Sequence, residues 1–337
     1  MNVFHEELSP KDEQQCNSAA LRILAKIRPQ WNESEIQFQV YTVGITNKIF
    51  SAFIPSDEDR IIFRIFGKNT EQIIDRQNEL VAWKKLADFG LAAPIYGQFS
   101  NGLVCGYLKG SSLTIDQIKD IKVTREVAKS MANLHERVPI DLGQKAQLFE
   151  KIYHFLAAFN PIFEDAKKQS IFEKHFPVSL STEIASLREK IEILSEEIAF
   201  CHNDLLIHNI VLDPKTKAIN FIDYEYAAPN YALFDLANHF CEWSGVDEPD
   251  YSLCPSRFEK AAFLYDYLKC RDGVVNGNRL DVILKRLPLF EAASHLFWTI
   301  WALVQSQNSL IDFDYLGYAV IRYEQYQKRL DKYVKQV

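Results

Sequence analysis

The spacing of hydrophobic residues in the first hundred positions is typical of β-strands. Ile36, Phe38 and Val40 are separated by polar residues, as expected of a strand with one buried face. Residues 48–54 and 60–66 are apolar stretches on either side of a polar turn, and they predict a hairpin. We therefore expect a small β-rich region at the start of the chain.

Two further patterns complete this region. Apolar residues return every seven positions over residues 70–89, which predicts a helix that ends at Gly90. Asn101 and Gly102 then stand between the apolar stretches 95–100 and 103–108. An Asn-Gly pair at such a place predicts a hairpin whose two turn residues both have positive φ.

The pattern changes after the short polar connector 109–112, and helical spacing dominates the rest of the chain. We predict an α+β fold with a small β-rich N-terminal lobe (residues 1–108, including one helix), a hinge (109–112) and a large, mainly helical C-terminal lobe (113–337). Strands are expected in the second lobe only at 209–212 and 218–224. Helices are expected there near 123–134, 145–158, 183–197, 231–243, 256–271, 279–306 and 314–332.

Composition excludes several classes of function. The chain has 337 residues and a net charge of −7, with 45 acidic against 38 basic side chains, so we expect no nucleic-acid partner. The six cysteines form no Cys-x-x-Cys pair, which argues for reduced thiols and against a zinc site. Residues 1–15 lack an apolar core and the longest apolar run, 296–304, is short. We expect a cytoplasmic protein without membrane insertion.

Three residues of the second lobe have the chemistry and spacing that phosphoryl transfer needs. Asp204 is followed five residues later by Asn209, and Asp223 ends the apolar run 219–222. A short hairpin brings its two ends together, so oxygens of Asn209 and Asp223 are expected to share metal ions. We predict Asp204 as the base that accepts the proton of the attacking hydroxyl, and the other two as magnesium ligands. The spacing resembles that of the protein-kinase-like superfamily.

The parts that would hold phosphate lie in the first lobe. Gly44, Thr46 and Asn47 stand between the first two predicted strands and are suited to folding over phosphates, although an ordinary hairpin turn explains them as well. Arg64 lies inside an apolar strand, where a cation needs a partner, and Glu79 on the following helix is the natural one. Arg64 either grips phosphate or forms a purely structural ion pair.

The residues after Asp223 argue for a small-molecule substrate. Protein kinases follow their metal-binding Asp with a long segment on which a peptide docks. In this chain a helical pattern begins by residue 231, and neither Asp-Phe-Gly nor Ala-Pro-Glu is present near it. No residues remain to build a peptide platform.

With these residues in place, the chain resembles the choline/ethanolamine kinase family from about residue 40 to residue 333. Its most specific blocks are residues 222–231, continuing to Trp243, and residues 293–301, followed by 313–318. The resemblance implies a bilobal protein-kinase-like fold and transfer of a phosphoryl group from ATP with Mg²⁺. It implies Asp204 as base, Asn209 and Asp223 as metal ligands, Gly44, Thr46, Asn47, Arg64, Glu79, Tyr107 and Leu108 at the nucleotide, and Tyr226, Glu242, Trp298, Trp301, Phe313 and Tyr318 at the amino alcohol.

Residue types alone make such a pocket reasonable. Trp298 and Trp301 share one face of a predicted helix, and aromatic faces attract an ammonium group. Without the resemblance, the same spacing indicates core packing. Glu242 is expected to supply the counter-charge. Asp235 is expected to accept hydrogen bonds from the catalytic loop, and His239 to be a packed, hydrogen-bonded residue, as is His202.

The resemblance favours ethanolamine as substrate. Leu205-Leu206 and residues 244–253 look like the ethanolamine branch, whereas residues 241–243 look like the choline branch. We expect conversion of ethanolamine to phosphoethanolamine, the first step of phosphatidylethanolamine synthesis through CDP-ethanolamine. The alternatives are a choline or dual kinase, an aminoglycoside phosphotransferase (which usually has His-Gly-Asp and lacks Trp-x-x-Trp), and a catalytically inactive kinase-like binding protein. The oligomeric state stays open, a homodimer included.

Overall fold

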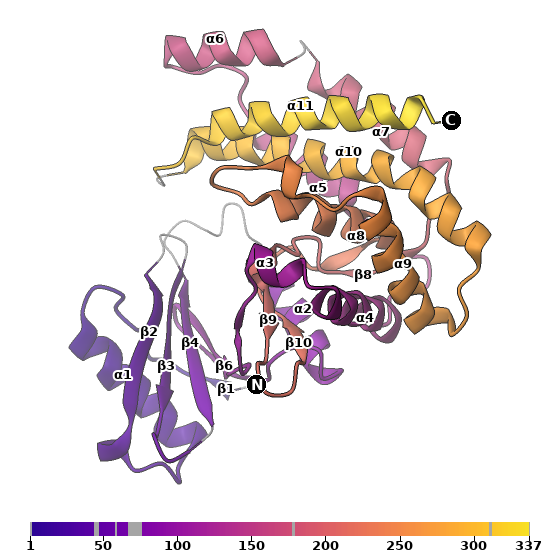
Figure 1. Ribbon diagram of the computed structural model, residues 1–337. Coiled ribbons are helices and arrows are strands. Elements are labelled where there is room, and N and C mark those ends of the chain that lie inside the picture. The colour runs from indigo at the N-terminus through magenta and orange to yellow at the C-terminus, as the bar shows by residue number, and fades with distance from the viewer. Residues whose placement is uncertain are drawn as a thin grey trace. The chain divides into compact units, whose positions relative to one another are not determined.

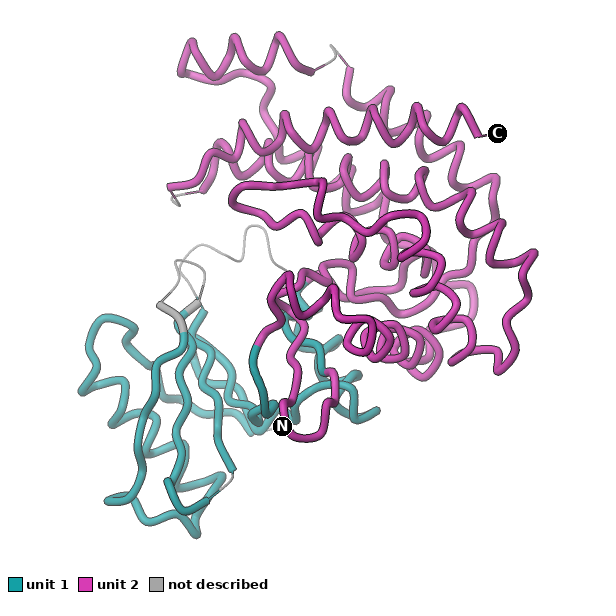
Figure 2. Tube along the Cα trace, viewed as in Figure 1, with its two compact units in different colours: residues 1–111, 220–225 teal, residues 112–219, 226–337 magenta. Residues whose placement is uncertain are grey.

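The computed structural model describes residues 2–43, 47–57, 59–66, 76–176, 179–309 and 312–336. The chain forms two compact units, which are coloured separately in Figure 2. Unit 1 contains residues 1–111 together with 220–225, and unit 2 contains residues 112–219 together with 226–337.

Unit 1 is built on a six-stranded sheet with the strand order β1-β5-β6-β4-β3-β2 (Figure 1). The short β1 pairs with β5 in parallel, and every other neighbouring pair is antiparallel. Arg64 lies at the centre, opposite Ile49 on one side and Leu103 on the other. The strands are β1 (Asn2–Val3), β2 (Gln37–Val43), β3 (Asn47–Phe53), β4 (Arg60–Phe66), β5 (Ile95–Phe99) and β6 (Gly102–Gly106).

A helix that the sequence analysis did not predict, α1 (Glu13–Ile27), forms much of the core of unit 1. Asp12 caps it by accepting a hydrogen bond from the backbone N–H of Gln15. Its buried residues recur at helical spacing and pack against the phenylalanines of the sheet. The expectation that the first hundred residues are mostly strand was wrong here, because the capping residue and this periodicity were overlooked. The 3-10 turn η1 (Glu33–Glu35) leads on to β2.

The turn between β5 and β6 differs from the prediction. Neither Asn101 nor Gly102 has a positive φ, so the predicted turn type was wrong. The side chain of Asn101 is bound instead to the backbone N–H and C=O of Leu8. A Cβ on Gly102 would lie 2.2 Å from the carbonyl oxygen of Arg64, so glycine serves close strand approach here. Helix α2 (Arg76–Asp88) does end before Gly90, whose φ is +69°, as predicted.

Unit 2 is mainly helical, and α10 lies at its centre (Figure 1). This helix packs against α11, α8 and α5, while α4 packs against α9. Each predicted helix is present within a few residues, and α6 and the short α3 were not predicted. The helices are α3 (Ile115–Ile118), α4 (Ile121–Arg137), α5 (Leu148–Ala158), α6 (Ala166–His175), α7 (Leu180–Glu192), α8 (Ala232–Cys241), α9 (Arg257–Asp272), α10 (Gly277–Asn308) and α11 (Tyr315–Val334), with 3-10 turns η3 (Ile207–Asn209), η4 (Glu242–Ser244) and η5 (Tyr251–Leu253).

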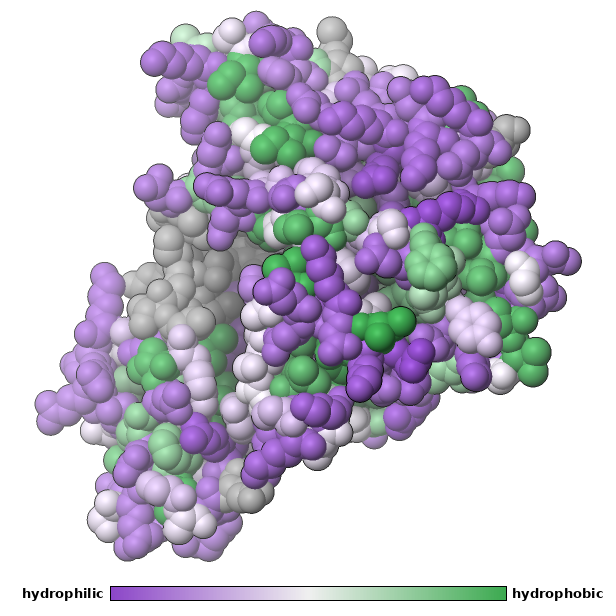
Figure 3. Space-filling model, in the orientation of Figure 1, coloured by the Kyte–Doolittle hydropathy of each residue, from purple (hydrophilic) through white to green (hydrophobic). Residues whose placement is uncertain are grey.

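Helix α10 is long and apolar enough to cross a membrane by length and composition alone. However, 94% of its most apolar stretch is buried inside the protein, as in the core helix of a soluble protein. Figure 3 shows mostly hydrophilic residues on the visible surface over the C-terminal half of α11, which packs on α10.

The described part of the chain contains two further small groups of short strands. The predicted hairpin is present as β9 (Ile210–Leu212) and β10 (Ile219–Phe221), which belong to a small sheet of order β10-β9-β7, with β7 at Ser111–Ser112. The structure also contains an antiparallel pair, β8 (Ile198–Cys201) with β11 (Ala228–Tyr231). The expectation of only one strand region in this half was therefore wrong.

Candidate active site

A carboxylate on α8 accepts hydrogen bonds from the turn that precedes Asp204. β8 ends at Cys201, and the next two backbone N–H groups, those of His202 and Asn203, donate to the carboxylate of Asp235 at 2.9 and 2.7 Å. Nε2 of His135 lies 2.9 Å from the same carboxylate. Burial favours the neutral acid, but the hydrogen bond and charge of His135 outweigh it and lower the pKa of Asp235. The predicted role of Asp235 as acceptor for the catalytic loop is confirmed.

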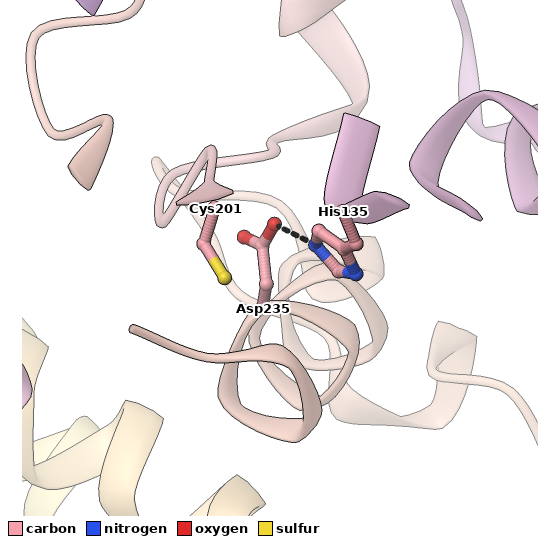
Figure 4. Close-up of side chains that lie close together, drawn as sticks. All are labelled: His135, Cys201 and Asp235. Atoms are coloured by element: carbon pink, nitrogen blue, oxygen red, sulfur yellow. Dashed lines mark hydrogen bonds and ion pairs between the residues drawn. The ribbon is translucent and has the colours of Figure 1, made fainter. Parts of the chain in front are cut away.

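His135, Cys201 and Asp235 lie together closely enough to suggest a metal site, since their ligand atoms are within 4.8 Å of one another (Figure 4). Each of these groups already has hydrogen-bond partners. The thiol of Cys201 donates toward carbonyl oxygens, and burial raises its pKa far above the ordinary value, so it stays protonated. This cluster is a hydrogen-bond network that supports the turn.

Asn203 sets the backbone direction immediately before Asp204. It is one of the few non-glycine residues with positive φ, at 66°. Its Nδ2 donates to the carbonyls of Tyr226 and Ala228 at 3.0 and 3.2 Å, and its Oδ1 accepts from Asn230 at 2.8 Å. These bonds tie the turn to β11 and the residues before it.

Asp204 and Asn209, two of the three predicted catalytic residues, lie together in unit 2. Both are buried, and Nδ2 of Asn209 donates to the carbonyl oxygen of Asp204 at 2.9 Å. The bond orients the amide, leaving Oδ1 as its oxygen for a metal. The next residue, Leu205, is also anchored, because its carbonyl lies 3.1 Å from Nδ1 of His239. Burial lowers the pKa of His239 to about 4, so this imidazole is neutral at physiological pH and acts as packing, as predicted.

Asp223, the third predicted catalytic residue, lies in unit 1 within a cluster of five charged side chains. Arg64 Nη1 is 2.7 Å from Glu79, and its Nη2 is 3.1 Å from Asp223 and 3.8 Å from Glu225. Arg76 Nη1 is 2.7 Å from the other oxygen of Glu79. The ion pair that the sequence analysis predicted between Arg64 and Glu79 is confirmed. We call these five residues the Arg64 cluster.

The Arg64 cluster suits a cation. Its three carboxyl groups outnumber its two guanidinium groups. Burial, together with the charge of Asp223, raises the pKa of Glu225 to about 8. The carboxylate of Asp223 is the accessible one, with 36% of its side chain exposed, compared with 17% for Glu225. The donor set fits magnesium, which prefers oxygen ligands.

The other predicted nucleotide residues are only partly described. Gly44 and Thr46 lie outside the described residues, and Asn47 is described only as the first residue of β3. Tyr107 follows β6 and stacks on Tyr41, with ring centroids 6.4 Å apart. Leu108, which follows Tyr107, is partly buried.

The predicted amino-alcohol residues include a continuous group of rings in unit 2. The ring centroids of Tyr226 and Trp298 are 5.3 Å apart, and those of Trp298 and Trp301 are 5.5 Å apart. Tyr315, which the sequence analysis did not assign to the site, links Trp301 to Phe313 at 5.8 and 4.8 Å. Phe313 in turn contacts Tyr318. We call these six residues (226, 298, 301, 313, 315 and 318) the aromatic cluster.

Glu242, the predicted counter-charge, already has a cationic partner in this chain. Arg322 Nη1 donates to its carboxylate at 2.7 Å, and both side chains are fully buried. The same guanidinium group donates to the hydroxyls of Tyr318 and Ser294, each at 3.2 Å. Sequence reasoning missed Arg322, although a cation one turn after Tyr318 on the buried face of a helix needs a partner.

Comparison with known proteins finds similar sequences and similar structures. Human ethanolamine kinase 2 is 36% identical over 316 residues, which cover 92% of this chain and 80% of that protein. The structure of Plasmodium vivax ethanolamine kinase matches 97% of this chain and 91% of its own, with a TM-score of 0.82 and 25% identity. Choline kinase from Cryptosporidium parvum matches 95% and 96%, with a TM-score of 0.77 and 25% identity. These neighbours confirm the predicted protein-kinase-like, α+β fold class.

One family model, that of choline/ethanolamine kinases, matches residues 38–327, which is most of the chain and includes the turn at Asp204, the Arg64 cluster and the aromatic cluster. Since both the family model and the relatives extend over nearly the whole sequence, this protein belongs to the choline/ethanolamine kinase family.

Proposed function

We propose that this enzyme phosphorylates ethanolamine with ATP, giving phosphoethanolamine and ADP, as the first step of phosphatidylethanolamine synthesis through CDP-ethanolamine. The main observation behind the proposal is the similarity to an ethanolamine kinase over 92% of the chain. Within this stretch, the turn before Asp204 is held by two backbone hydrogen bonds to Asp235. We further propose that the reaction takes place in the cytoplasm, where the six free thiols of the chain stay reduced.

In this proposal Asp204 orients the hydroxyl of ethanolamine and accepts its proton. The hydroxyl oxygen bonds to the γ-phosphorus while the bond from that phosphorus to the β–γ bridging oxygen breaks, and ADP leaves. Such a base must be held in a fixed position relative to the hydroxyl. The two bonds to Asp235 and the three made by Asn203 supply that rigidity.

Asn209 through Oδ1 and Asp223 through its carboxylate would hold magnesium, which neutralises charge on the phosphates when it is bound. Arg64 is assigned to the phosphates as well as to Asp223, because its guanidinium carries several donors in one plane. Gly44, Thr46, Asn47, Glu79, Tyr107 and Leu108 complete the nucleotide site in this proposal.

The aromatic cluster is proposed to receive the ammonium group of the substrate. Ring faces attract an ammonium by about 0.5–2 kcal/mol each, depending on how dry the site is. Glu242 gives the pocket a formal negative charge, but its ion pair with Arg322 makes it weaker as an acceptor for a primary ammonium.

That ion pair favours choline as a second candidate substrate. A trimethylammonium group has no N–H donors and needs only aromatic walls. Asp247, which could serve a primary ammonium, is exposed, and Asp250 caps η5 by accepting from the backbone of Ser252. A cluster of aromatic rings beside a carboxylate that is already paired suits choline as well as ethanolamine.

The test is acceptor-dependent release of ADP by the purified chain. We expect kcat/KM to be at least about tenfold higher for ethanolamine than for choline, a difference of about 1.4 kcal/mol in transition-state binding. Chelation of magnesium is expected to abolish release, and added magnesium to restore it. A reversed ratio would establish the choline candidate. ADP release that neither acceptor increases would refute both and favour an inactive, binding-only protein.

A further inference from the structure

A cavity of about 240 Å³ lies in unit 2 between η5, α9, α10 and α11, and no step of the proposed reaction uses it. Four cations line it, Arg257, Lys260, Arg329 and Lys332, with Glu291 as the carboxylate among the lining residues. We call it the basic cavity. A concentration of positive charge is unusual in a chain whose net charge is −7.

The carboxylate of Glu291 cannot balance these cations alone. It forms an ion pair with Lys260 and lies 3.3 Å from Arg329 Nη1. Arg257 has its own partner outside the cavity, Asp281, but both side chains are more than half exposed, so water screens that pair. Lys332 forms no ion pair with any residue in the described part of the chain. Lys332 is exposed overall, but partial desolvation of its ammonium group and the neighbouring cations lower its pKa.

Two buried donors of the basic cavity also lack a partner. Within the described residues, neither the hydroxyl of Tyr251 nor Nε of Arg329 makes a hydrogen bond. Oε2 of Glu291 makes none either, but its charge is paired with Arg329. Buried polar groups are nearly always hydrogen-bonded, so two unpaired donors beside excess positive charge indicate a ligand with several anionic acceptor oxygens. The cavity is smaller than the about 300–1,000 Å³ of sites for drug-sized ligands, which indicates a small ligand.

We propose that the basic cavity binds a phosphate dianion, either inorganic phosphate or the phosphate group of a small monoester. Phosphate offers acceptor oxygens on all sides, which matches donors that come from η5, α9 and α11. The proposed reaction uses none of the residues that line the basic cavity. Binding of phosphate there can therefore be tested whether or not the proposed reaction is correct.

Helix α10 contributes residues to both the basic cavity and the aromatic cluster. The rings of Tyr251 and His295 are 5.4 Å apart, edge to face. His295 lies on α10 between Glu291, at the cavity, and Trp298, in the aromatic cluster. If the proposed function holds, its product is itself a phosphate monoester, which makes the product one candidate ligand of the basic cavity.

The proposal is tested by isothermal titration calorimetry on the whole chain, with inorganic phosphate and phosphoethanolamine as separate titrants. Lys332→Gln removes a cation that has no ion pair within the described residues, and we expect it to weaken binding of the preferred anion at least about tenfold. Arg329→Gln is expected to do the same. Lys328→Gln, an exposed position on the same helix outside the cavity, is the matched control and should change affinity by less than about twofold.

The two titrants distinguish the sources. Tighter binding of phosphoethanolamine assigns the site to a monoester, and equal or tighter binding of inorganic phosphate assigns it to the free ion. Because calorimetry needs no turnover, the result does not depend on which alcohol the enzyme phosphorylates. The proposal is overturned if the unmodified chain binds neither anion, or if both Lys332→Gln and Arg329→Gln bind them like the control.

Discussion

His239 shows how two hydrogen bonds select one form of a buried side chain. Nδ1 of His239 lies 3.1 Å from the carbonyl of Leu205, and its Nε2 lies 3.3 Å from the indole Nε1 of Trp243. The carbonyl can only accept and the indole can only donate, so the imidazole carries its single proton on Nδ1. A second proton would place two N–H donors face to face.

This arrangement predicts a pH-dependent stability. Because the pKa of His239 falls from 6.5 to about 4 on folding, the folded state binds fewer protons than the unfolded state between these values. Stability is complete above about pH 6.5 and falls by about 3 kcal/mol as pH drops to about 4, at about 1.4 kcal/mol per pH unit. Urea unfolding at several pH values measures this.

Other groups titrate over the same range, so the comparison is made with His239→Gln. Glutamine keeps one donor and one acceptor but has no proton to gain. The variant is expected to lose less stability between pH 6.5 and 4 than the unmodified protein. If the free energy of unfolding falls equally with pH in both proteins, His239 does not cause the loss of stability between pH 6.5 and 4.

Asp204 is the residue on which turnover is expected to depend most. Asp204→Asn keeps the shape but removes the base, and we expect kcat to fall by about 10²–10⁴, with ATP affinity changed less than about threefold. Steady-state kinetics and a nucleotide-binding titration measure the two effects. Asp116→Asn, an exposed position on α3, is the control. A kcat within about threefold of normal for Asp204→Asn would remove its assignment as base.

Individual residues were predictable where charge demanded a partner. A cation inside the apolar strand that became β4 required a carboxylate, and Glu79 on the next helix is its partner. The same reasoning, applied to Arg322, would have found Glu242, but these residues are far apart in sequence and several other acids could have served. A buried cation in the sequence implies that it has an acidic partner. Which acid that is depends on the packing of the folded chain.

At the scale of elements, α8 supports the turn between β8 and Asp204 mainly through the carboxylate of Asp235, which binds two backbone N–H groups, while Asn238 adds a longer bond to the carbonyl of Asn203 at 3.3 Å. Removing that carboxylate by Asp235→Ala leaves the buried N–H groups of His202 and Asn203 unpaired. We expect the free energy of unfolding to fall by about 3–5 kcal/mol and activity to be lost. Chemical denaturation measures the first, and ADP release measures the second.

The control for this substitution is a partly exposed carboxylate that also has a cationic partner. Asp266 pairs with Arg125, whose side chain is 49% exposed. Asp266→Asn should change the free energy of unfolding by less than about 1 kcal/mol. If Asp235→Ala is no more destabilising than this, α8 does not support the turn through that contact.

Elements with a strong local signal were predicted, and elements that depend on distant pairing were not. β9, β10 and the long helices carry their own periodicity. β8 and β11 have four residues each and are buried along most of their length, so neither shows alternation, and they become a pair only across 26 intervening residues. The turn type at Asn101 was predicted wrongly because the side chain of Asn101 binds Leu8, which is 93 residues away in the sequence.

At the scale of the whole molecule, substrate preference is predicted to rest on the aromatic cluster. Trp298 is buried, and its indole N–H donates to Asn238 at 2.8 Å. Trp298→Ala should raise KM for ethanolamine at least about tenfold while KM for ATP changes less than about twofold, because only the amino alcohol is assigned to these rings. Initial rates with each substrate varied in turn measure both.

Loss of a large buried side chain could lower activity merely by loosening the fold. Trp31→Ala, which removes a tryptophan of similar burial from unit 1, controls for this. It should lower thermal stability while leaving both KM values within about twofold. Equal increases of the two KM values in Trp298→Ala would assign that residue to packing rather than to the substrate.

The unusual backbone at Asn203 limits which residues evolution can place there. Glycine would readily adopt the φ of 66° found at Asn203, but it has no side chain to bind the carbonyls of Tyr226 and Ala228. Most other residues disfavour a positive φ. A saturation library at this codon should therefore yield active clones almost only with asparagine, followed at a distance by glycine and aspartate.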